Sequence, residues 1–325
     1  MFQTRITRLF GIRYPIIQGG LHWLATAPLA SAVSEAGGLG LLSSLSFPDQ
    51  EALRQEIRRT REMTRKPFGV NLSMLPELTE KDRTEEILQV IIDEGVPVVE
   101  TSGRSPEPFA KRLKTAGIKL IHKVPSVRFA QKAESIGADA VTIVGFECGG
   151  HPGMEDVGSL VLIPSAADAV TIPVIAGGGI ADARGFLAAL ALGAEGVVMG
   201  TRFVPTHECP AHPRIKDWFV QAKETDTLMI QRSIRNAERV IKNRAAEKAA
   251  AMERGGASLQ ELMAVISGDL GKKALAEGNL DSAVIACGQC VGLIHEIKSV
   301  KEVIDEIIRG ARTLLGKLDS LADRE

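Results

Sequence analysis

The sequence has 325 residues, of which 45% are hydrophobic, and its 39 basic residues nearly balance its 40 acidic residues. These values exclude a disordered or fibrous chain and allow one large domain, or a barrel-sized domain with a smaller appendage. The balanced charge favours neither nucleic acid nor a membrane surface as a partner. Aromatic residues make up only 4% of the chain and 32 residues are glycine, which favours alternating α and β elements over an aromatic-rich sandwich.

The cysteine content and the N-terminus bear on the compartment. The four cysteines are too few for a disulfide framework in a chain of this length, so we expect reduced thiols and a cytoplasmic protein. The first ten residues lack the apolar stretch of a secretory signal. The longest uncharged run, residues 14–34, contains two prolines and His22, so no membrane helix is expected.

Eight short apolar, β-branched runs recur along the chain. They cover residues 15–20, 38–44, 68–73, 96–102, 119–124, 140–146, 173–179 and 196–201. Helical spacing is found between them, at residues 49–64, 81–94, 107–116, 127–136 and 183–192, with Gly95, Gly117, Gly137 and Gly193 as stops. This alternation predicts an α/β fold of the closed TIM (β/α)₈ barrel type. An open doubly wound sheet is the alternative, and it is less favoured because no run carries a GxGxxG turn followed by an acidic residue.

The composition changes after Thr201. Residues from about His207 to Asp281 are polar, rich in Ala, Lys, Arg and Glu, and helical in pattern. We therefore expect a barrel formed by residues 1–206 and 287–325, with a small helical insert at residues 207–286 that caps the substrate. The apolar stretch 282–294 and the amphipathic segment 300–318 are predicted to return to the barrel as closing helices.

Glycines cluster at the ends of the last two runs, in Gly177-Gly178-Gly179 and in Gly200-Thr201-Arg202. The active site of a TIM barrel lies at the carboxyl ends of its strands, often with a phosphate site at the last two. Turns without side chains let backbone N–H groups approach an anion, so the sequence predicts a phosphate cradle there. The alternative is that these glycines only allow tight turns.

Polar residues mark the ends of other runs. Gln18, Gly19 and Gly20 close the first run, Asn71 lies in the third, Glu100 in the fourth, and Lys123 near the end of the fifth. A buried lysine is costly unless it meets an anion or an electron-rich acceptor, so Lys123 is predicted to point at a ligand. The alternative is a salt bridge from Lys123 to a carboxylate such as Glu100 or Glu147.

The sixth run leads into a glycine-rich loop. Gly149 and Gly150 would let the backbone lie flat against a planar ligand, and Pro152 and Gly153 fix a loop that projects His151 over the barrel mouth. A histidine there can donate a hydrogen bond or move a proton at neutral pH. The alternative is a histidine that caps its own turn.

Two further patterns carry weaker signals. Cys287 and Cys290 suggest a redox or metal site, as do His207, Cys209 and His212, but the spacing does not define tetrahedral ligands, so we predict no metal. Small residues on a packed helix, with Gln289 facing the cleft, are the preferred interpretation. Basic residues spaced three and four apart predict a solvated helix face rather than a nucleic-acid site. They are Arg232, Arg235, Arg239 and Lys242.

Several motifs, taken in order and at these spacings, resemble the nitronate monooxygenase family, formerly called 2-nitropropane dioxygenases. They are residues 4–11, 14–20 (YPIIQGG), 36–40 (AGGLG), 67–72 (PFGVNL), 145–153 (GFECGGHPG), 175–180 (IAGGGI) and 199–203 (MGTRF). The resemblance implies a TIM barrel that binds FMN without a covalent bond.

The resemblance also implies roles for individual residues. Gly178, Gly179, Gly200 and Thr201, flanked by Gly177 and Met199, would hold the phosphate of FMN. The isoalloxazine would lie along Asn71, Lys123, Gly149 and Gly150, with Gln18, Gly19, Gly20 and Leu21 on its other side. His151 and Lys123 would be the catalytic residues, with His151 beside the reactive edge of the flavin.

The resemblance covers more than one activity. The first interpretation is oxidation of alkyl nitronates with O₂ to a carbonyl compound and nitrite. The alternatives are an NAD(P)H:quinone reductase, which residues 147–153 and 208–213 resemble most, an FMN-dependent enoyl-acyl carrier protein reductase, and a non-catalytic flavin-binding barrel. NADH or NADPH is the candidate reductant, His22 and Gln289 are candidate substrate-lining residues, and a homodimer is compatible with the pattern. The partner is predicted to be a small molecule, not nucleic acid or membrane.

Overall fold

Eight parallel strands form the centre of the computed structural model, which describes residues 2–74 and 82–322. They are β1 (Ile16–Gln18), β2 (Gly40–Ser43), β3 (Phe68–Met74), β4 (Val98–Gly103), β5 (Lys119–Val124), β6 (Ala140–Val144), β7 (Val174–Gly177) and β8 (Gly196–Met199). Their order is β1-β8-β7-β6-β5-β4-β3-β2, and a parallel bridge between Ile17 and Leu39 joins β1 to the start of β2. The predicted TIM barrel and the eight predicted strands are confirmed.

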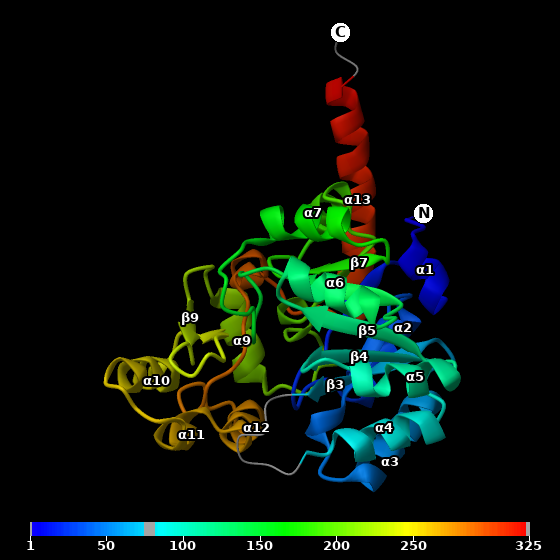
Figure 1. Cartoon of the computed structure of the whole chain (residues 1–325). Helices are drawn as coiled ribbons and strands as arrows, with labels where there is room; N and C mark the ends of the chain where they lie inside the picture. Colours follow the sequence, from blue (N-terminus) through cyan, green and yellow to red (C-terminus); the bar gives the residue numbers. More distant parts are fainter. Residues whose placement is uncertain (1, 75–81, 323–325) are drawn as a thin grey trace.

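Helices surround the barrel and follow its strands (Figure 1). They are α2 (Ala27–Glu35), α3 (Gln50–Met63), α4 (Thr84–Asp93), α5 (Glu107–Thr115), α6 (Val127–Ser135), α7 (Ser159–Ala169) and α8 (Ala183–Ala191), with a short 3₁₀ turn η1 (Ser44–Ser46) after β2. The predicted stops Gly95, Gly117, Gly137 and Gly193 all have positive φ, between 57° and 96°, as expected where a chain leaves a helix. Residue 81, where one helix was predicted to start, lies outside the described residues.

The barrel interior is apolar at one end and polar at the other. Helix α1 (Arg5–Phe10) contributes Ile6 and Phe10 to a buried cluster with Val98, Ile121 and other inward-facing strand residues. Side chains two positions apart share a face of a strand. The residues that follow on the inner face of β4 and β5 are therefore Glu100 and Lys123, and these lie nearer the carboxyl ends. The polar layer thus occupies the end at which barrel enzymes carry their active sites.

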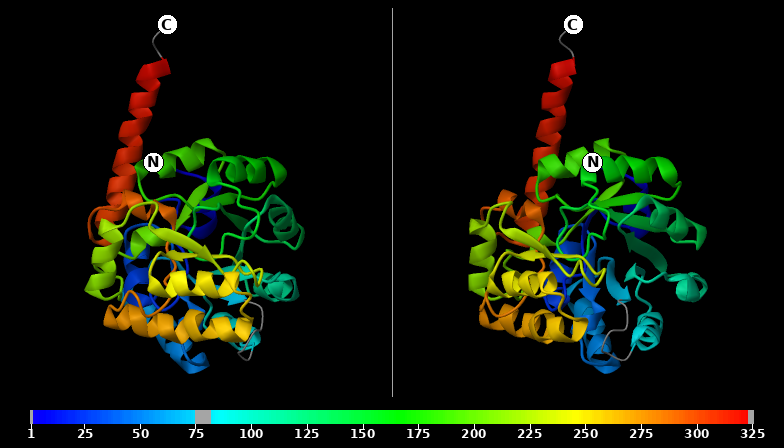
Figure 2. Two further views of the ribbon diagram at one scale, coloured as in Figure 1. Left: turned by 90° about the vertical axis from the view of Figure 1, so that its left-hand side faces the viewer. Right: turned by 60° about the vertical axis from the view of Figure 1, so that its left-hand side comes forward.

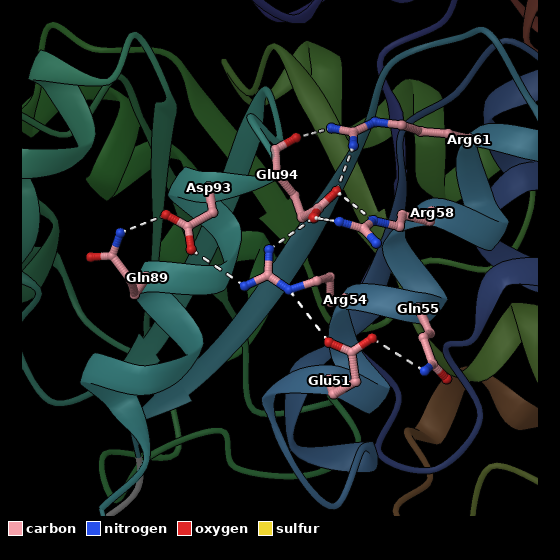
Figure 3. A network of polar contacts seen from close by, with 8 residues as sticks. All are labelled: Glu51, Arg54, Gln55, Arg58, Arg61, Gln89, Asp93 and Glu94. Carbon is pink, nitrogen blue, oxygen red and sulfur yellow. Dashed lines mark hydrogen bonds and ion pairs between the residues drawn. The ribbon is translucent and has the colours of Figure 1, made fainter.

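An ionic network joins α3 to the end of α4 (Figure 3). The Glu94 carboxylate accepts hydrogen bonds from Arg54 at 2.9 Å, Arg58 at 2.9 Å and Arg61 at 3.1 Å. Burial opposes ionisation of Glu94, but the guanidinium groups outweigh it and lower the pKa of this carboxyl. The network holds two neighbouring outer helices together and lies away from the barrel rim.

The segment after β8 and its 3₁₀ turn η2 (Thr201–Phe203) is an insert of mixed structure (Figure 2). It contains α9 (Pro213–Gln221), β9 (Thr227–Ile230), β10 (Glu238–Ile241), α10 (Arg244–Arg254), α11 (Leu259–Ile266) and α12 (Gly268–Glu277). The antiparallel pair β9–β10 contradicts the expected helix face at residues 232–242. Apolar residues Ile230 and Val240 of the hairpin pack on α10, and this burial outweighed the helical spacing of the basic residues.

The chain then returns to the barrel differently from the prediction. Residues 282–288 are a loop rather than part of a closing helix, and only the short 3₁₀ helix η3 (Gln289–Leu293) follows. The amphipathic helix is confirmed as α13 (Val300–Ala322). Its first half packs on α8 and α2, while its second half projects beyond the body of the protein (Figures 1 and 2). The exact boundaries of the insert stay a prediction, as does a homodimer.

No helix within the described ranges combines the length and apolar character that crossing a bilayer requires.

Candidate functional site

The predicted site residues lie at or just beyond the carboxyl ends of barrel strands, and these ends share one rim. Gln18 ends β1 and is followed by Gly19, Gly20 and Leu21; Asn71 and Lys123 lie in β3 and β5; Gly149, Gly150 and His151 follow β6; Gly177 ends β7 and is followed by Gly178 and Gly179; Met199 ends β8 and is followed by Gly200 and Thr201. The structure therefore brings together residues that are spread from position 18 to position 201 of the sequence.

The turns after β7 and β8 leave backbone donors unused. Gly178 and Gly179 have φ of 92° and 73°, and a Cβ on Gly178 would lie 3.0 Å from the carbonyl oxygen of Gly145. Within residues 2–74 and 82–322, no hydrogen bond leads from the backbone N–H of Gly178, Gly179 or Gly200 to a protein acceptor. Backbone donors are normally satisfied, so this group of free N–H groups suits an anion. The glycines meet the steric needs of the turn and also provide this cradle.

Lys123 has a protein partner in the polar layer. Its Nζ lies 2.9 Å from Oε2 of Glu100, and Asn71 Nδ2 donates to the same oxygen at 2.8 Å. Glu100 is fully buried, whereas the Lys123 side chain keeps 23% of its exposure. The salt bridge to Glu100 that the sequence left as an alternative is therefore present. Glu147 is instead occupied by Ser159, whose backbone N–H and hydroxyl both donate to its carboxylate.

Two buried oxygens in this region have no hydrogen-bond partner in the described part of the chain. They are Oε1 of Glu100 and Oγ1 of Thr142, and Thr142 is the ladder partner of Lys123. A buried polar atom without a partner is costly, and native structures rarely contain one that no ligand or water satisfies. Together with the free amides, these oxygens fit a polar ligand at the rim.

Gln18 is already engaged within the protein. Its Oε1 accepts from the backbone N–H of Leu41 at 3.2 Å, and its Nε2 donates to the carbonyl oxygen of Gly19. The side chain is fully buried, so it supports the turn after β1. Gly20 lies against Asn71, since a Cβ there would come within 2.4 Å of the Asn71 side chain.

The loop after β6 lies against the returning segment of the chain. A Cβ on Gly149 would lie 2.6 Å from the backbone nitrogen of Gly288, so no larger residue fits. Gly288 N donates to Thr201 Oγ1 at 2.9 Å, and Gln289 N donates to the carbonyl oxygen of Glu147. The ends of β6 and β8 are thus tied together through residues 288–289, and His151 is left exposed beside them.

Arg239 was missed as a site residue by the sequence analysis. It is 3% exposed, donates from Nε and Nη2 to the carbonyl oxygen of Phe146 at 3.2 and 3.1 Å, and lies 4.5 Å from the centre of the Phe146 ring. Burial lowers its pKa. The neighbouring Val240 and Ile241 were the only available signal that Arg239 belongs to a strand rather than a solvated helix.

The cysteines are all free, and those in the core are not activated. Burial raises the pKa of Cys290 to about 12 and of Cys209 to about 11, so both are neutral thiols at physiological pH. In the parts of the chain that are described, no group of three or more His, Cys, Asp or Glu residues is placed to hold a metal.

The insert reaches the rim on the β1 side as well. The His22 ring stacks on Trp23 with centroids 4.2 Å apart, and Trp23 Nε1 donates to the carbonyl oxygen of Gly268 at the start of α12. Lys272 of the same helix lies 4.7 Å from the Trp23 ring. These contacts place His22 between the barrel and the insert, where an entrance is expected; its role and that of Gln289 in lining a substrate stay predictions.

Comparison with known proteins agrees with this geometry. A family model described as nitronate monooxygenase matches residues 3–310. The chain belongs to the nitronate monooxygenase family. Its resemblance to that family is thereby confirmed, and like its relatives it is a flavin-dependent oxidoreductase.

Three relatives match this member of the nitronate monooxygenase family over nearly its whole length. FabK from Thermotoga maritima is 39% identical, with a TM-score of 0.93, and the match covers 99% of this chain and 100% of FabK. A (3aS,4S,5R,7aS)-5-hydroxy-7a-methyl-1-oxo-octahydro-1H-indene-4-carboxyl-CoA dehydrogenase from Mycobacterium tuberculosis is 35% identical over 99% of both chains. A probable nitronate monooxygenase from Staphylococcus saprophyticus is 32% identical over 97% of this chain and 99% of that protein.

Proposed function

We propose that this protein is an FMN-dependent oxidoreductase that acts on an acyl thioester, with reduction of an α,β-unsaturated acyl group as its reaction. Bound FMN would supply the exchange of two electrons with the substrate. The free amides after β7 and β8 suit its phosphate, and the turn they lie in has no room for a side chain at Gly178. The unsatisfied Glu100 and Thr142 oxygens suit the polar edge of its ring system.

The residues of the chain would then have separate tasks. The amides of Gly178, Gly179 and Gly200 would bind and orient the phosphate. Lys123 would place a positive charge, fixed by Glu100, under the ring system, which favours negative charge there. His151 is exposed at the rim and would hold a proton at a ring nitrogen for delivery to the substrate. The insert would exclude water from the rim.

The thioester proposal rests on the match to FabK, an enoyl-acyl carrier protein reductase. That match has the highest identity of the three relatives reported above and spans both chains. The Mycobacterium relative is named for a carboxyl-CoA substrate, which is also an acyl thioester. Both point to the same substrate chemistry and therefore favour one of the alternatives raised from the sequence over the first interpretation.

Nitronate oxidation is the second candidate, supported by the family model and by the Staphylococcus relative. In that reaction His151 would take a proton or hold the substrate rather than deliver a proton. Quinone reduction, the third alternative, has only the sequence resemblance behind it.

The decisive experiment is anaerobic stopped-flow spectroscopy of the flavin-loaded enzyme. The oxidised enzyme is first mixed with NADH or NADPH. The reduced enzyme is then mixed with crotonyl-CoA, with a benzoquinone or with buffer. In a parallel experiment the oxidised enzyme is mixed with an alkyl nitronate. We expect the nicotinamide nucleotide to bleach the flavin and crotonyl-CoA to restore its absorbance within the turnover time. If the nitronate bleaches the flavin and crotonyl-CoA does not reoxidise the reduced enzyme, nitronate oxidation replaces the thioester proposal.

The flavin of a non-catalytic carrier would bleach once and would not be reoxidised repeatedly.

The variant that tests the role of His151 is His151→Ala. It should slow the crotonyl-CoA step by about 100-fold and leave FMN binding unchanged, since loss of a general acid costs about 10²–10⁴ in rate. An unchanged rate would remove His151 from the mechanism.

A cytoplasmic location is also proposed, because all four cysteines are free thiols. Fractionation of the producing cells tests it, and recovery from an oxidising compartment would contradict it.

A further inference from the structure

The hairpin of the insert pairs with the loop that carries His151. Gly150 and Arg239 form an isolated antiparallel bridge in which each backbone N–H donates to the other's carbonyl oxygen, at 3.0 and 2.7 Å. His151 follows Gly150 in the loop, and Glu238 precedes Arg239 in β10. The two residues therefore flank the same bridge and are neighbours across it, Glu238 on the insert and His151 on the rim.

Glu238 is held in place by a neighbour whose own backbone is strained. Gln231 Nε2 donates to Oε2 of Glu238 at 2.5 Å, and Asn236 donates to the other end of the Gln231 amide at 2.8 Å. Gln231 has a φ of 63° and is 5% exposed, so a buried non-glycine residue occupies the left-handed region. Such a conformation persists where the surrounding contacts enforce it. The Gln231 amide holds the Glu238 carboxyl group through its hydrogen bond.

Burial and nearby charged side chains decide the pKa of Glu238. Burial raises the pKa of the Glu238 carboxyl, and the charge of His151 opposes that rise. Arg239 turns away to Phe146 and Thr227, and Arg232 pairs with Asp156. Glu253 of α10 accepts from the backbone N–H groups of Gln231 and Ser233.

We propose that Glu238 is a positioning residue for His151: the insert supplies a carboxyl group that orients the imidazole ring above the barrel rim. The histidine comes from the barrel and the carboxylate from the insert, so the proton-delivering group is complete only when the β9–β10 hairpin is docked. A carboxyl group beside an imidazole fixes the orientation of the ring and decides which ring nitrogen faces the substrate. This inference rests on the proposed function of His151.

The first test needs neither flavin nor turnover. The carboxyl carbon of Glu238 is followed by NMR as a function of pH in the FMN-free protein, and the resonance is assigned with Glu238→Gln. In the His151→Gln variant we expect the pKa of Glu238 to rise further, because the charge of His151, which opposes the effect of burial, is removed. An unchanged titration of Glu238 would overturn the proposal, and this result does not depend on the substrate.

The second test is kinetic and uses a carboxylate of α10, the helix that packs on the hairpin, as its control. Glu238→Gln keeps the size of the side chain and its bond to Gln231 but removes the charge, and we expect kcat to fall about tenfold with KM within about twofold. Glu238→Asp should recover part of the loss and return the pH profile of the unmodified enzyme, because it restores the charge. Glu247→Gln removes an exposed carboxylate of α10 and leaves the bonds of Gln231 in place, so it should leave the pH profile unchanged.

The kinetic results distinguish the positioning role of Glu238 from the proposed function of His151. If His151→Ala slows the reaction and Glu238→Gln changes neither kcat nor the pH profile, the positioning proposal is wrong and the proposed function stands. If His151→Ala has no effect either, the role proposed for His151 fails as well. Equal changes of the pH profile in Glu247→Gln and Glu238→Gln would assign the effect to the general charge of the insert and would also overturn the proposal.

Discussion

Removing one partner of the Lys123–Glu100 ion pair is predicted to destabilise the barrel strongly. At 2.9 Å and an effective dielectric constant of about 20, the attraction is about 6 kcal/mol. Glu100 is fully buried, so Lys123→Met leaves an uncompensated carboxylate in the polar layer. Breaking such a pair costs about 3–5 kcal/mol. Because Lys123 keeps part of its exposure, we expect a value near the lower end.

The assay is urea unfolding of the FMN-free protein in a double-mutant cycle. Lys123→Met and Glu100→Gln are each expected to lower the midpoint, whereas the double variant should be less destabilised than the sum, with a coupling of about 2–3 kcal/mol. The exposed pair Arg112–Glu85, at 2.5 Å, is the control, and its coupling should stay below about 1 kcal/mol. Additive effects within about 0.5 kcal/mol at Lys123 and Glu100 would refute the reasoning.

Three further predictions address stability. Burial lowers the pKa of His122 from 6.5 to about 4, so the unfolded chain takes up more protons between these pH values. The free energy of unfolding should therefore be highest above pH 6.5 and fall by about 3 kcal/mol as the pH drops to 4. In His122→Gln the urea midpoint should lose this dependence on pH. Gly149→Ala places a Cβ 2.6 Å from Gly288 N, so limited proteolysis should cut residues 282–288 faster, whereas Gly316→Ala, with no atom within 4 Å, should not. Glu94→Gln should cost about 1–2 kcal/mol, a difference that shrinks in 1 M salt; equal losses at both salt concentrations would contradict the ionic network.

The barrel could be predicted because its signals are local. Each strand is buried on both faces and forms a continuous apolar run, and the glycines after the helices mark where the chain turns back. The same logic places the glycines after β7 and β8 on the rim. The insert hairpin could not be predicted, because its strands have four residues each and their apolar residues gain burial only from α10.

In the candidate site, too, local signals could be predicted from the sequence and contacts between distant segments could not. Lys123 and Glu100 were both identified near strand ends, but only the β4–β5 register decides that Glu100, and not Glu147, is the partner. Arg239 and Glu238 lie more than 85 residues after the loop they contact, and pairing at that distance has no signature in the local pattern.

The phosphate cradle is tested most directly by comparing FMN with riboflavin on the FMN-free protein, because the two ligands differ only in the phosphate. Quenching of flavin fluorescence gives both dissociation constants at one salt concentration. Free backbone donors to a charged group contribute about 1.5–3 kcal/mol each, so we expect riboflavin to bind at least about 100-fold more weakly than FMN. Equal affinity for the two ligands would contradict the assignment of the amides of Gly178, Gly179 and Gly200 to a phosphate.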